Sequence, residues 1–227
     1  VQAYELNVIG LHVHTGSDIL DAEVFLKGAE ILFDAAREFH DLAFLDFGGG
    51  FKVAYKEGDI TTDIQDVGRK VSAAFKTFCK EYGRELEIWF EPGKFLVSEC
   101  GYLLTKANVV KPTPATTFVG VNSGLNHLLR PMMYDAYHSV VNISKLDGPE
   151  RVYTIVGYIC ETDTIAADRK LKEVKEGDIK RQGSPYTKER NHGRYTQKSN
   201  FCRFLTKGAK IICPFCFLLF CYFFQNT

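Results

Sequence analysis

The chain has 227 residues, of which 45% are hydrophobic and 25% are charged. This composition excludes an intrinsically disordered chain and is enough for one sizeable core and the beginning of a second. Lys plus Arg and Asp plus Glu number 28 each, so the formal net charge is zero and no overall positive field is available to hold nucleic acid. The charge is unevenly distributed, because nine Lys or Arg residues but only one acid, Glu189, occur from Lys180 onward.

The first part of the chain alternates short apolar runs with amphipathic segments, which is the pattern of β/α units. Residues 7–13 predict a buried strand, and Ser17 or Asp18 can cap the helix that follows it. Residues 42–47 predict a second strand, and the helical face after it ends at Gly83. We therefore expect a parallel sheet, either open or closed into a barrel.

A third strand is predicted at residues 86–90, and we expect the α/β domain to span residues 1–98. The sequence then changes to runs of strand-forming residues separated by Pro, Gly and Asn turns, which predicts a separate domain over residues 99–179. Its predicted strands are 102–110, 116–121, 140–143 and 151–158.

Residues 180–227 are expected to form an aberrant or disordered tail outside both domains. A polar stretch is followed by an apolar block at 211–224, and neither has a readable period. The block is shorter than the roughly 20 residues that span a bilayer as a helix and contains Pro214, so we expect no membrane span. A frame change or unspliced read-through near Ile179 would produce such text, and a membrane-touching tail is the alternative. The CxxC of Cys213–Cys216 is interpreted as accidental.

The ends of the chain and its cysteines bear on its origin. The seven cysteines form no even, repeating framework and no signal peptide opens the chain, so a reducing cytoplasm is expected. Val1 stands where a Met is usual, and the chain enters a strand almost directly. We therefore expect a fragment.

Each predicted strand of the first domain ends in polar or glycine-rich residues, and the carboxyl ends of parallel strands are where α/β folds bind ligands. His12 and His14 could ligate a metal from one side of a strand, but no third ligand is evident nearby, and hydrogen-bonded structural histidines are the favoured interpretation. We predict no metal site. Three consecutive glycines suit an anion or simply a tight turn. Glu91 and Lys94 leave the third strand together, as a site or as a surface ion pair.

In this order, the motifs resemble those of the fold-type III pyridoxal-phosphate decarboxylases, the family of the ornithine, arginine and diaminopimelate decarboxylases. Residues 14–17 (HTGS) resemble the family's H-x-G-S, and residues 45–51 (LDFGGGF) resemble its D-x-G-G-G-F. Residues 91–94 (EPGK) resemble its E-P-G-R, with Lys94 in place of Arg, which keeps the charge but loses the bidentate fork.

Two later segments resemble the diaminopimelate branch. Residues 130–138 (RPMMYDAYH) are similar to its R-P-x-x-Y-x-A-Y-H, and residues 160–164 (CETDT) to the family's C-E-x-x-D. The acid of the second motif stands one position early, so no role is assigned to Asp163. A bidentate Arg is the expected partner of the second carboxylate that diaminopimelate has and ornithine lacks.

The resemblance implies an α/β fold: the C-terminal part of a (β/α)8 TIM-type barrel that binds pyridoxal 5'-phosphate, followed by a β-rich domain, both incomplete. It implies a carboxy-lyase that converts meso-diaminopimelate to L-lysine, acting as a homodimer whose active sites are shared. Related ornithine, arginine or carboxynorspermidine decarboxylases and a non-catalytic binding relative are the alternatives. The lysine that carries the cofactor is expected outside this chain, so the fragment alone is predicted to be inactive.

The resemblance also implies roles for individual residues. His14 and Cys160 would be catalytic, the first stacked on the cofactor ring and the second a proton donor in the neighbouring subunit. The implied cofactor ligands are His14, Ser17, Gly48, Gly49, Gly50, Glu91 and Lys94, and the implied substrate ligands are Arg130, Tyr134 and Glu161.

Overall fold

The computed structural model describes residues 4–183 and 209–211. They divide into two compact units, the first made of residues 4–53 and 60–98 with strand β10, and the second of residues 54–59 and 99–183. Within the part of the chain described, no helix combines the length and the apolar character needed to cross a membrane.

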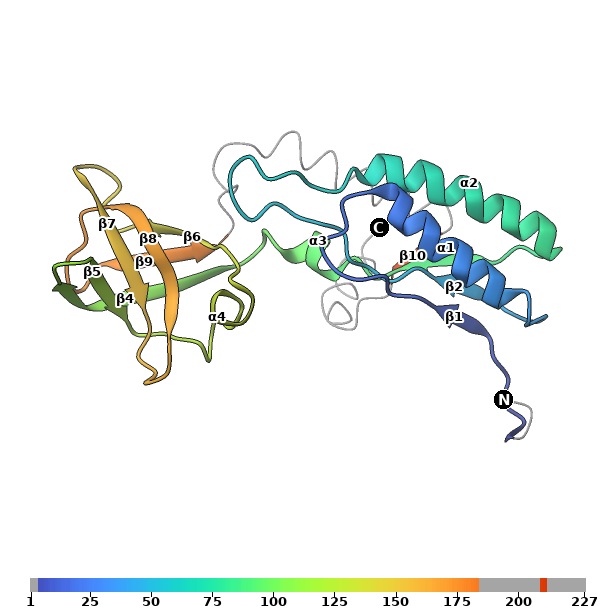
Figure 1. The fold of residues 1–227 in the computed structure, drawn as a ribbon, viewed down its shortest axis with the longest axis horizontal. Helices are drawn as coiled ribbons and strands as arrows, with labels where there is room; N and C mark the ends of the chain where they lie inside the picture. The colour runs from blue at the N-terminus through green and yellow to red at the C-terminus, as the bar shows by residue number, and fades with distance from the viewer. Residues whose placement is uncertain (1–3, 184–208, 212–227) are drawn as a thin grey trace, which may run out of the picture. The chain divides into compact units, whose positions relative to one another are not determined.

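The first unit is a parallel sheet with two helices on one face (Figure 1). Its strand order is β1-β2-β3-β10, and all three pairings are parallel. One helix connects β1 to β2 and the other connects β2 to β3, as the alternation of the sequence predicts. The elements are β1 (Gly10–His12), α1 (Ala22–Ala36), β2 (Phe44–Asp46), α2 (Ile64–Tyr82), β3 (Glu87–Phe90), the short α3 (Gly93–Val97) and β10 (Ala209–Ile211).

The start of α1 differs from the expectation. Asp21 is the N-cap, and its side chain accepts a hydrogen bond from the backbone N–H of Glu23 at 2.9 Å. Asp18 has a left-handed backbone with φ of 58°, whereas an N-cap residue needs an extended conformation. Ser17 and Asp18 therefore lie in the connection between β1 and α1, where their side chains are available for other contacts.

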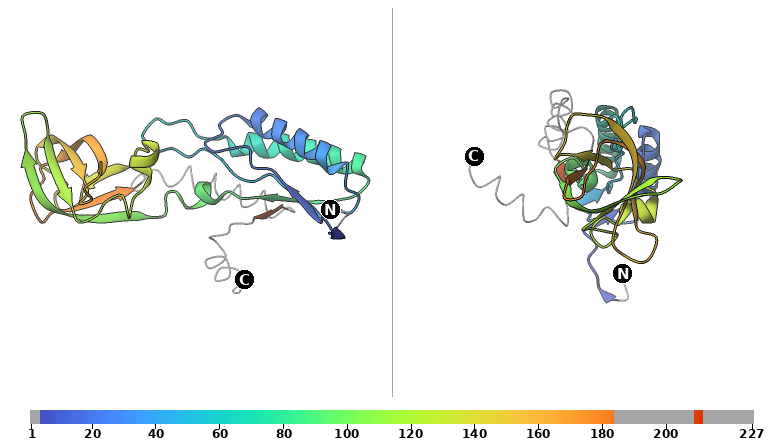
Figure 2. Two further views of the ribbon diagram at one scale, coloured as in Figure 1. Left: turned by 60° about the horizontal axis from the view of Figure 1, so that its bottom comes forward. Right: turned by 90° about the vertical axis from the view of Figure 1, so that its left-hand side faces the viewer.

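Phenylalanine packing joins the two helices to each other and to the sheet. The rings of Phe33 on α1 and Phe78 on α2 stack with centroids 4.5 Å apart, and Phe47, just after β2, contacts Phe33 edge-on. Asp63 caps the start of α2, and Gly83 ends it in the left-handed conformation, as predicted. Both helices lie side by side on one face of the strands in the views of Figures 1 and 2.

Residues 180–227 were expected to lie outside both domains. Strand β10 lies within this range and pairs in parallel with β3, so this part of the range belongs to the first sheet. The edge of β3 otherwise presents unpaired N–H and C=O groups, which favour the addition of a further strand. Residues 184–208 and 212–227, which include the CxxC at Cys213–Cys216, lie outside the described residues.

The second unit is a six-stranded sheet with the order β6-β9-β4-β5-β7-β8. Its two end strands, β6 and β8, contact each other, so the sheet curls almost into a closed barrel (Figure 2, right). All pairings are antiparallel except that of β5 with β7. The elements are β4 (Tyr102–Pro112), β5 (Thr117–Val121), α4 (Arg130–Tyr134), β6 (Ser139–Asn142), β7 (Glu150–Val156), β8 (Thr164–Lys172) and β9 (Ile179–Gly183).

The sequence pattern did not predict β8 and β9, which are rich in charged and polar residues. In β9, Lys180 and Gln182 point inward and are fully buried, although polar residues at alternate positions normally indicate a solvent-facing side. The sheet therefore continues past residue 179, where the β-rich domain was expected to end. Apolar side chains from the other strands supply the core, among them Ala107, Val119, Val121, Ile155, Ile165 and Leu171.

The buried Lys180 makes the stability of the second unit depend on pH. Its side chain is 0% exposed, and the nearest carboxylate oxygen, on Asp178, is 3.8 Å from Nζ. Burial lowers the pKa of Lys180 from 10.5 to about 8, and Asp178 offsets only part of this effect. Because the unfolded chain holds this proton more tightly, the free energy of unfolding should rise between about pH 8 and pH 10.5.

Lys180→Met should remove this rise and increase stability near pH 7 by about 3 kcal/mol, the equivalent of the pKa difference. Urea unfolding measured from pH 7 to 10.5 tests the prediction, with the exposed Lys111→Met as the matched control. The same pH dependence in the Lys180 variant and the wild-type chain would contradict it.

Candidate functional site

The three parallel strands β1, β2 and β3 end at the same edge of the first sheet. Their register places His12 beside Asp46 and Asp46 beside Trp89. Glu91 follows β3 directly, and its backbone N–H donates to the carbonyl of Gly48 at 2.8 Å. The polar residues that follow these strands are therefore gathered at one edge, as expected for a parallel sheet.

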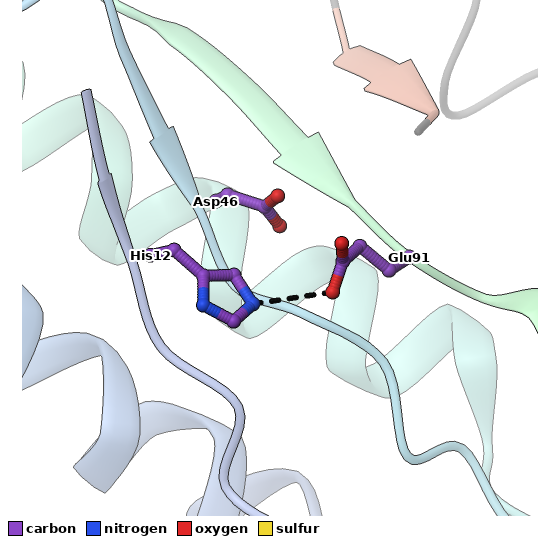
Figure 3. A group of neighbouring side chains, drawn as sticks. All are labelled: His12, Asp46 and Glu91. Carbon is purple, nitrogen blue, oxygen red and sulfur yellow. Dashed lines mark hydrogen bonds and ion pairs between the residues drawn. The ribbon is translucent and has the colours of Figure 1, made fainter. Parts of the chain in front are cut away.

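His12, Asp46 and Glu91 form a cluster at this edge (Figure 3). Nε2 of His12 lies 3.1 Å from Oε2 of Glu91, and one potential ligand atom from each of the three residues lies within 4.8 Å of the others. The side chains of His12 and Glu91 are 49% and 30% exposed, so the Glu91 carboxylate remains open to a ligand. The cluster can accept a proton or a cationic nitrogen.

Asp46 is the buried member of the cluster, at 5% exposure. Burial raises its pKa, and the charge of Glu91 adds to the effect, while the backbone N–H of Gly48, which donates to Oδ1 at 2.8 Å, opposes it. Asp46 thus shapes the turn after β2 and lies next to Glu91 in the cluster. The sequence pattern assigns no role to Asp46, and His12 was interpreted as a hydrogen-bonded structural histidine.

His12 and His14 make different contacts. β1 ends at His12, so His14 lies beyond the strand and the pair is not presented on one strand face as expected. Nδ1 of the exposed His14 accepts the backbone N–H of Gly49 at 3.3 Å, which leaves the proton of a neutral ring on Nε2. The side chains of the cluster meet because the ends of the three strands lie in register, and a sequence alone does not specify this register.

The glycine run packs backbone to backbone against the segments after β1 and β3. A Cβ atom at Gly49 would collide with the carbonyl oxygen of Glu91, and one at Gly50 with the carbonyl oxygen of Gly16. Gly48 and Gly50 also have φ of 64° and 94°, a region that favours glycine. The glycines therefore serve the close approach of three chain segments as well as any anion.

A positive group lies beside the segment that follows β1. Nζ of Lys94, in α3, donates to Oγ of Ser17 at 3.2 Å and to Oδ1 of Asp18 at 2.5 Å. An ammonium, a hydroxyl and glycine-rich backbone are groups that bind phosphate. These residues fit the phosphate of pyridoxal 5'-phosphate, while Glu91 fits its ring nitrogen. Asp18 is the exception, because its carboxylate forms an ion pair with the Lys94 ammonium that a phosphate needs.

The second unit holds the predicted substrate ligands Arg130 and Tyr134, which lie at the two ends of α4. The Arg130 guanidinium lies 5.5 Å from the ring centroids of both Tyr55 and Tyr134, and Nη2 donates to the Tyr55 hydroxyl at 3.2 Å. Stacking on two rings limits the orientations of the exposed guanidinium, which suits recognition of a carboxylate. Burial lowers the pKa of His138, and the positive charge of Arg130 adds to this effect.

Cys160 and Glu161 lie on the connection between β7 and β8, and both are exposed. No disulfide occupies Cys160, so its thiol is accessible from solvent. The structure therefore groups the predicted residues into two sets, one in each unit. The first set is His14, Ser17, Gly48, Gly49, Gly50, Glu91 and Lys94, and the second is Arg130, Tyr134, Cys160 and Glu161.

Comparison with known proteins shows which family this chain is similar to. The family described as "Pyridoxal-dependent decarboxylase, C-terminal sheet domain" matches residues 18–180. The chain belongs to this family of pyridoxal-dependent decarboxylases. It is 38% identical over 179 residues to the diaminopimelate decarboxylase of Methanothermobacter thermautotrophicus, which covers 75% of this chain and 42% of the relative. It is 36% identical over 191 residues to that of Archaeoglobus fulgidus, with 78% and 45% covered.

Solved structures of the family confirm the fold class. The diaminopimelate decarboxylase of M. jannaschii in complex with L-lysine matches with a TM-score of 0.71 and 30% identity, over 81% of this chain and 44% of that one. A further diaminopimelate decarboxylase structure matches with a TM-score of 0.74 and 29% identity, over 81% and 47%. The chain thus spans less than half the length of these relatives.

The Asp18–Lys94 ion pair generates a prediction about cofactor binding. Asp18→Asn should increase the affinity of the chain for pyridoxal phosphate about fivefold, because the phosphate no longer competes with a carboxylate worth about 1 kcal/mol. Lys94→Met should reduce the affinity. Quenching of Trp89, the one tryptophan of the chain, reports the titration, and pyridoxal without phosphate tests where the gain arises.

Asp41→Asn removes an exposed carboxylate paired with Arg84 and is the matched control. It should leave the titration unchanged. Equal affinity in the Asp18→Asn variant and the wild-type chain would refute the proposed competition at Lys94.

Proposed function

We propose that this chain serves a pyridoxal 5'-phosphate-dependent decarboxylase that removes carbon dioxide from meso-diaminopimelate to give L-lysine. The observation that carries the proposal is the gathering of Glu91, Ser17 and Lys94 at one sheet edge in a chain whose relatives are diaminopimelate decarboxylases. The relative solved with L-lysine supports the same substrate class.

The first unit would hold the cofactor. When bound, pyridoxal phosphate supplies an electron sink through its protonated ring nitrogen. The Glu91 carboxylate would hold the proton on that nitrogen, since an opposite charge favours the protonated form. His14 would cover one face of the ring, while Ser17, Lys94 and the backbone of the glycine run would bind the phosphate.

The second unit would recognise and protonate the substrate. Arg130 would pair with the distal carboxylate of diaminopimelate, supported by the orientation that Tyr55 and Tyr134 impose on its guanidinium. Glu161 would bind the distal amine, and the exposed Cys160 thiol would return a proton to the carbon that loses carbon dioxide. The last two residues would act in the site of a second copy.

We therefore propose a homodimer with shared active sites, working in the cytoplasm. Exposure of Cys160 and Glu161 supports a role toward another chain, and the unpaired Cys79, Cys100 and Cys160 are compatible with a reducing compartment. A related ornithine or arginine decarboxylase is the alternative and makes the opposite prediction for Arg130, because those substrates have no second carboxylate.

A chimeric enzyme tests the function. Residues 1–183 would replace the matching segment of the Methanothermobacter thermautotrophicus enzyme, which then supplies the rest of the barrel and the cofactor lysine. Release of carbon dioxide should be much faster from meso-diaminopimelate than from ornithine, and the 227-residue chain alone should release none. Equal turnover of both substrates would favour the alternative. No turnover by a folded chimera that retains the cofactor would support a non-catalytic relative.

In this chimera, Arg130→Ala should lower kcat/KM for meso-diaminopimelate about 10- to 100-fold, since a charge-assisted pair with the distal carboxylate is lost. Arg130→Lys should recover only part of the loss, because Lys keeps the charge without the bidentate fork. Steady-state kinetics with meso-diaminopimelate and ornithine measure the effect. An unchanged kcat/KM in the Ala variant would exclude Arg130 as a substrate ligand.

A further inference from the structure

The segments that carry Arg130 and Cys160 leave the second sheet side by side. They follow β5 and β7, the one parallel pair of that sheet in the described residues, with Val119 beside Ile155 in the register. Neighbouring parallel strands end at the same edge, so residues 122–129, which lead to Arg130, and residues 157–163 emerge together. Their common edge brings two loops of different sequence position into contact.

Asp163 is the last residue of the second loop, and its carboxylate accepts one hydrogen bond from the first loop and one from its own loop. Oδ1 accepts the backbone N–H of Leu125 at 2.8 Å, and Oδ2 accepts the backbone N–H of Ile159 at 3.0 Å. The carbonyl of Asp163 also accepts the N–H of Gly157 at 2.8 Å. The residue is only 6% exposed, so these bonds are shielded from water and are of the strong, charge-assisted kind.

Two glycines make room for this carboxylate. A Cβ atom at Gly124 would collide with Oδ2 of Asp163, and a Cβ at Gly157 would collide with the same oxygen. Neither glycine has a positive φ, so the requirement is close approach and not an unusual backbone conformation. One glycine from each loop therefore lies against the same carboxylate.

A second link lies nearer the surface. Asn126 and Tyr158 are joined by hydrogen bonds between the amide group and the phenol, with Nδ2 to Oη at 3.0 Å and Oη to Oδ1 at 3.2 Å. Both residues are exposed, so this link competes with water and contributes less than the buried carboxylate.

We propose that Asp163 is a positioning residue that sets the Arg130 segment and the Cys160–Glu161 segment at a fixed distance from each other. Its carboxylate is the common acceptor of both loops, and its removal frees them together. The consequence for substrate binding rests on the proposed function, whereas the link between the loops does not. The motif alone assigns no role to Asp163, because this acid stands one position early in it.

Amide hydrogen exchange in the full 227-residue chain, followed by NMR, tests the link. The amides of Leu125 and Ile159 lie outside every helix and strand, yet both should exchange slowly in the wild-type chain. Asp163→Asn turns a donor NH2 toward one amide N–H and leaves the other with a neutral acceptor in place of a carboxylate oxygen, so exchange at both amides should become about tenfold faster or more. Exchange at Ile155, in the core of β7, should stay unchanged.

Faster exchange at Leu125 and Ile159, with exchange at Ile155 unchanged, is the result that a link through Asp163 predicts. Acceleration at Ile159 only would indicate a local role, acceleration at all three would indicate general destabilisation, and fast exchange in the wild-type chain would remove the link. Each of these results would overturn the proposal. Asp147→Asn, which changes an exposed acid in another loop, is the matched control.

Gly124→Ala tests the same contact from the opposite loop. Its methyl group would push the Asp163 carboxylate away, so exchange at Ile159 should accelerate although the substitution is 35 residues earlier in the chain. No effect at Ile159 would overturn the proposal.

The chimeric enzyme separates this inference from the function. Asp163→Asn should raise KM and lower kcat for meso-diaminopimelate, because both loops move, while the absorbance of the bound cofactor stays the same. A change in the cofactor spectrum instead would point to disruption of the first unit and contradict a positioning role. The exchange result holds or fails independently of whether the chimera decarboxylates meso-diaminopimelate.

Discussion

Backbone contact among three chain segments is the constraint on which the candidate cofactor site depends. The carbonyl oxygens of Glu91 and Gly16 lie where the Cβ atoms of Gly49 and Gly50 would be, so any other residue would push the segments apart. Because the segments follow neighbouring parallel strands, their polar side chains then meet at one edge. Close backbone packing and a binding surface thus have the same structural origin.

The charges at this edge are separated in a way that suits a zwitterionic cofactor. Asp46 and Glu91 lie with His12 at one place, and Lys94 lies with Ser17 at another. A protonated pyridine ring and a phosphate require opposite charges of this kind. Burial and the charge of Glu91 raise the pKa of Asp46, and Asp18 limits the strength of the cationic end by pairing with Lys94.

The second unit uses the same geometric principle in a different kind of sheet. Its strands pair mostly antiparallel, which would send successive loops to opposite edges. The single parallel pair described, β5 with β7, instead places the segments leading to Arg130 and Cys160 at a common edge. The Asp163 carboxylate, which belongs to the second segment, accepts one hydrogen bond from Leu125 across the two segments and one from Ile159 within its own, and Gly124 and Gly157 provide the space.

The sequence determined the α/β units, the end of α2 at Gly83, the family motifs and the β-rich second part, because hydrophobic period and glycine position are local properties. It did not predict β9, whose buried Lys180 and Gln182 imitate a solvent-facing pattern, or the cap of α1 at Asp21. The neighbours of Glu91 and the partners of Asp163 were also beyond it. Strand register and loop contact join residues 34 to 79 positions apart, such as His12 with Asp46 and with Glu91, and only the tertiary structure brings these residues together.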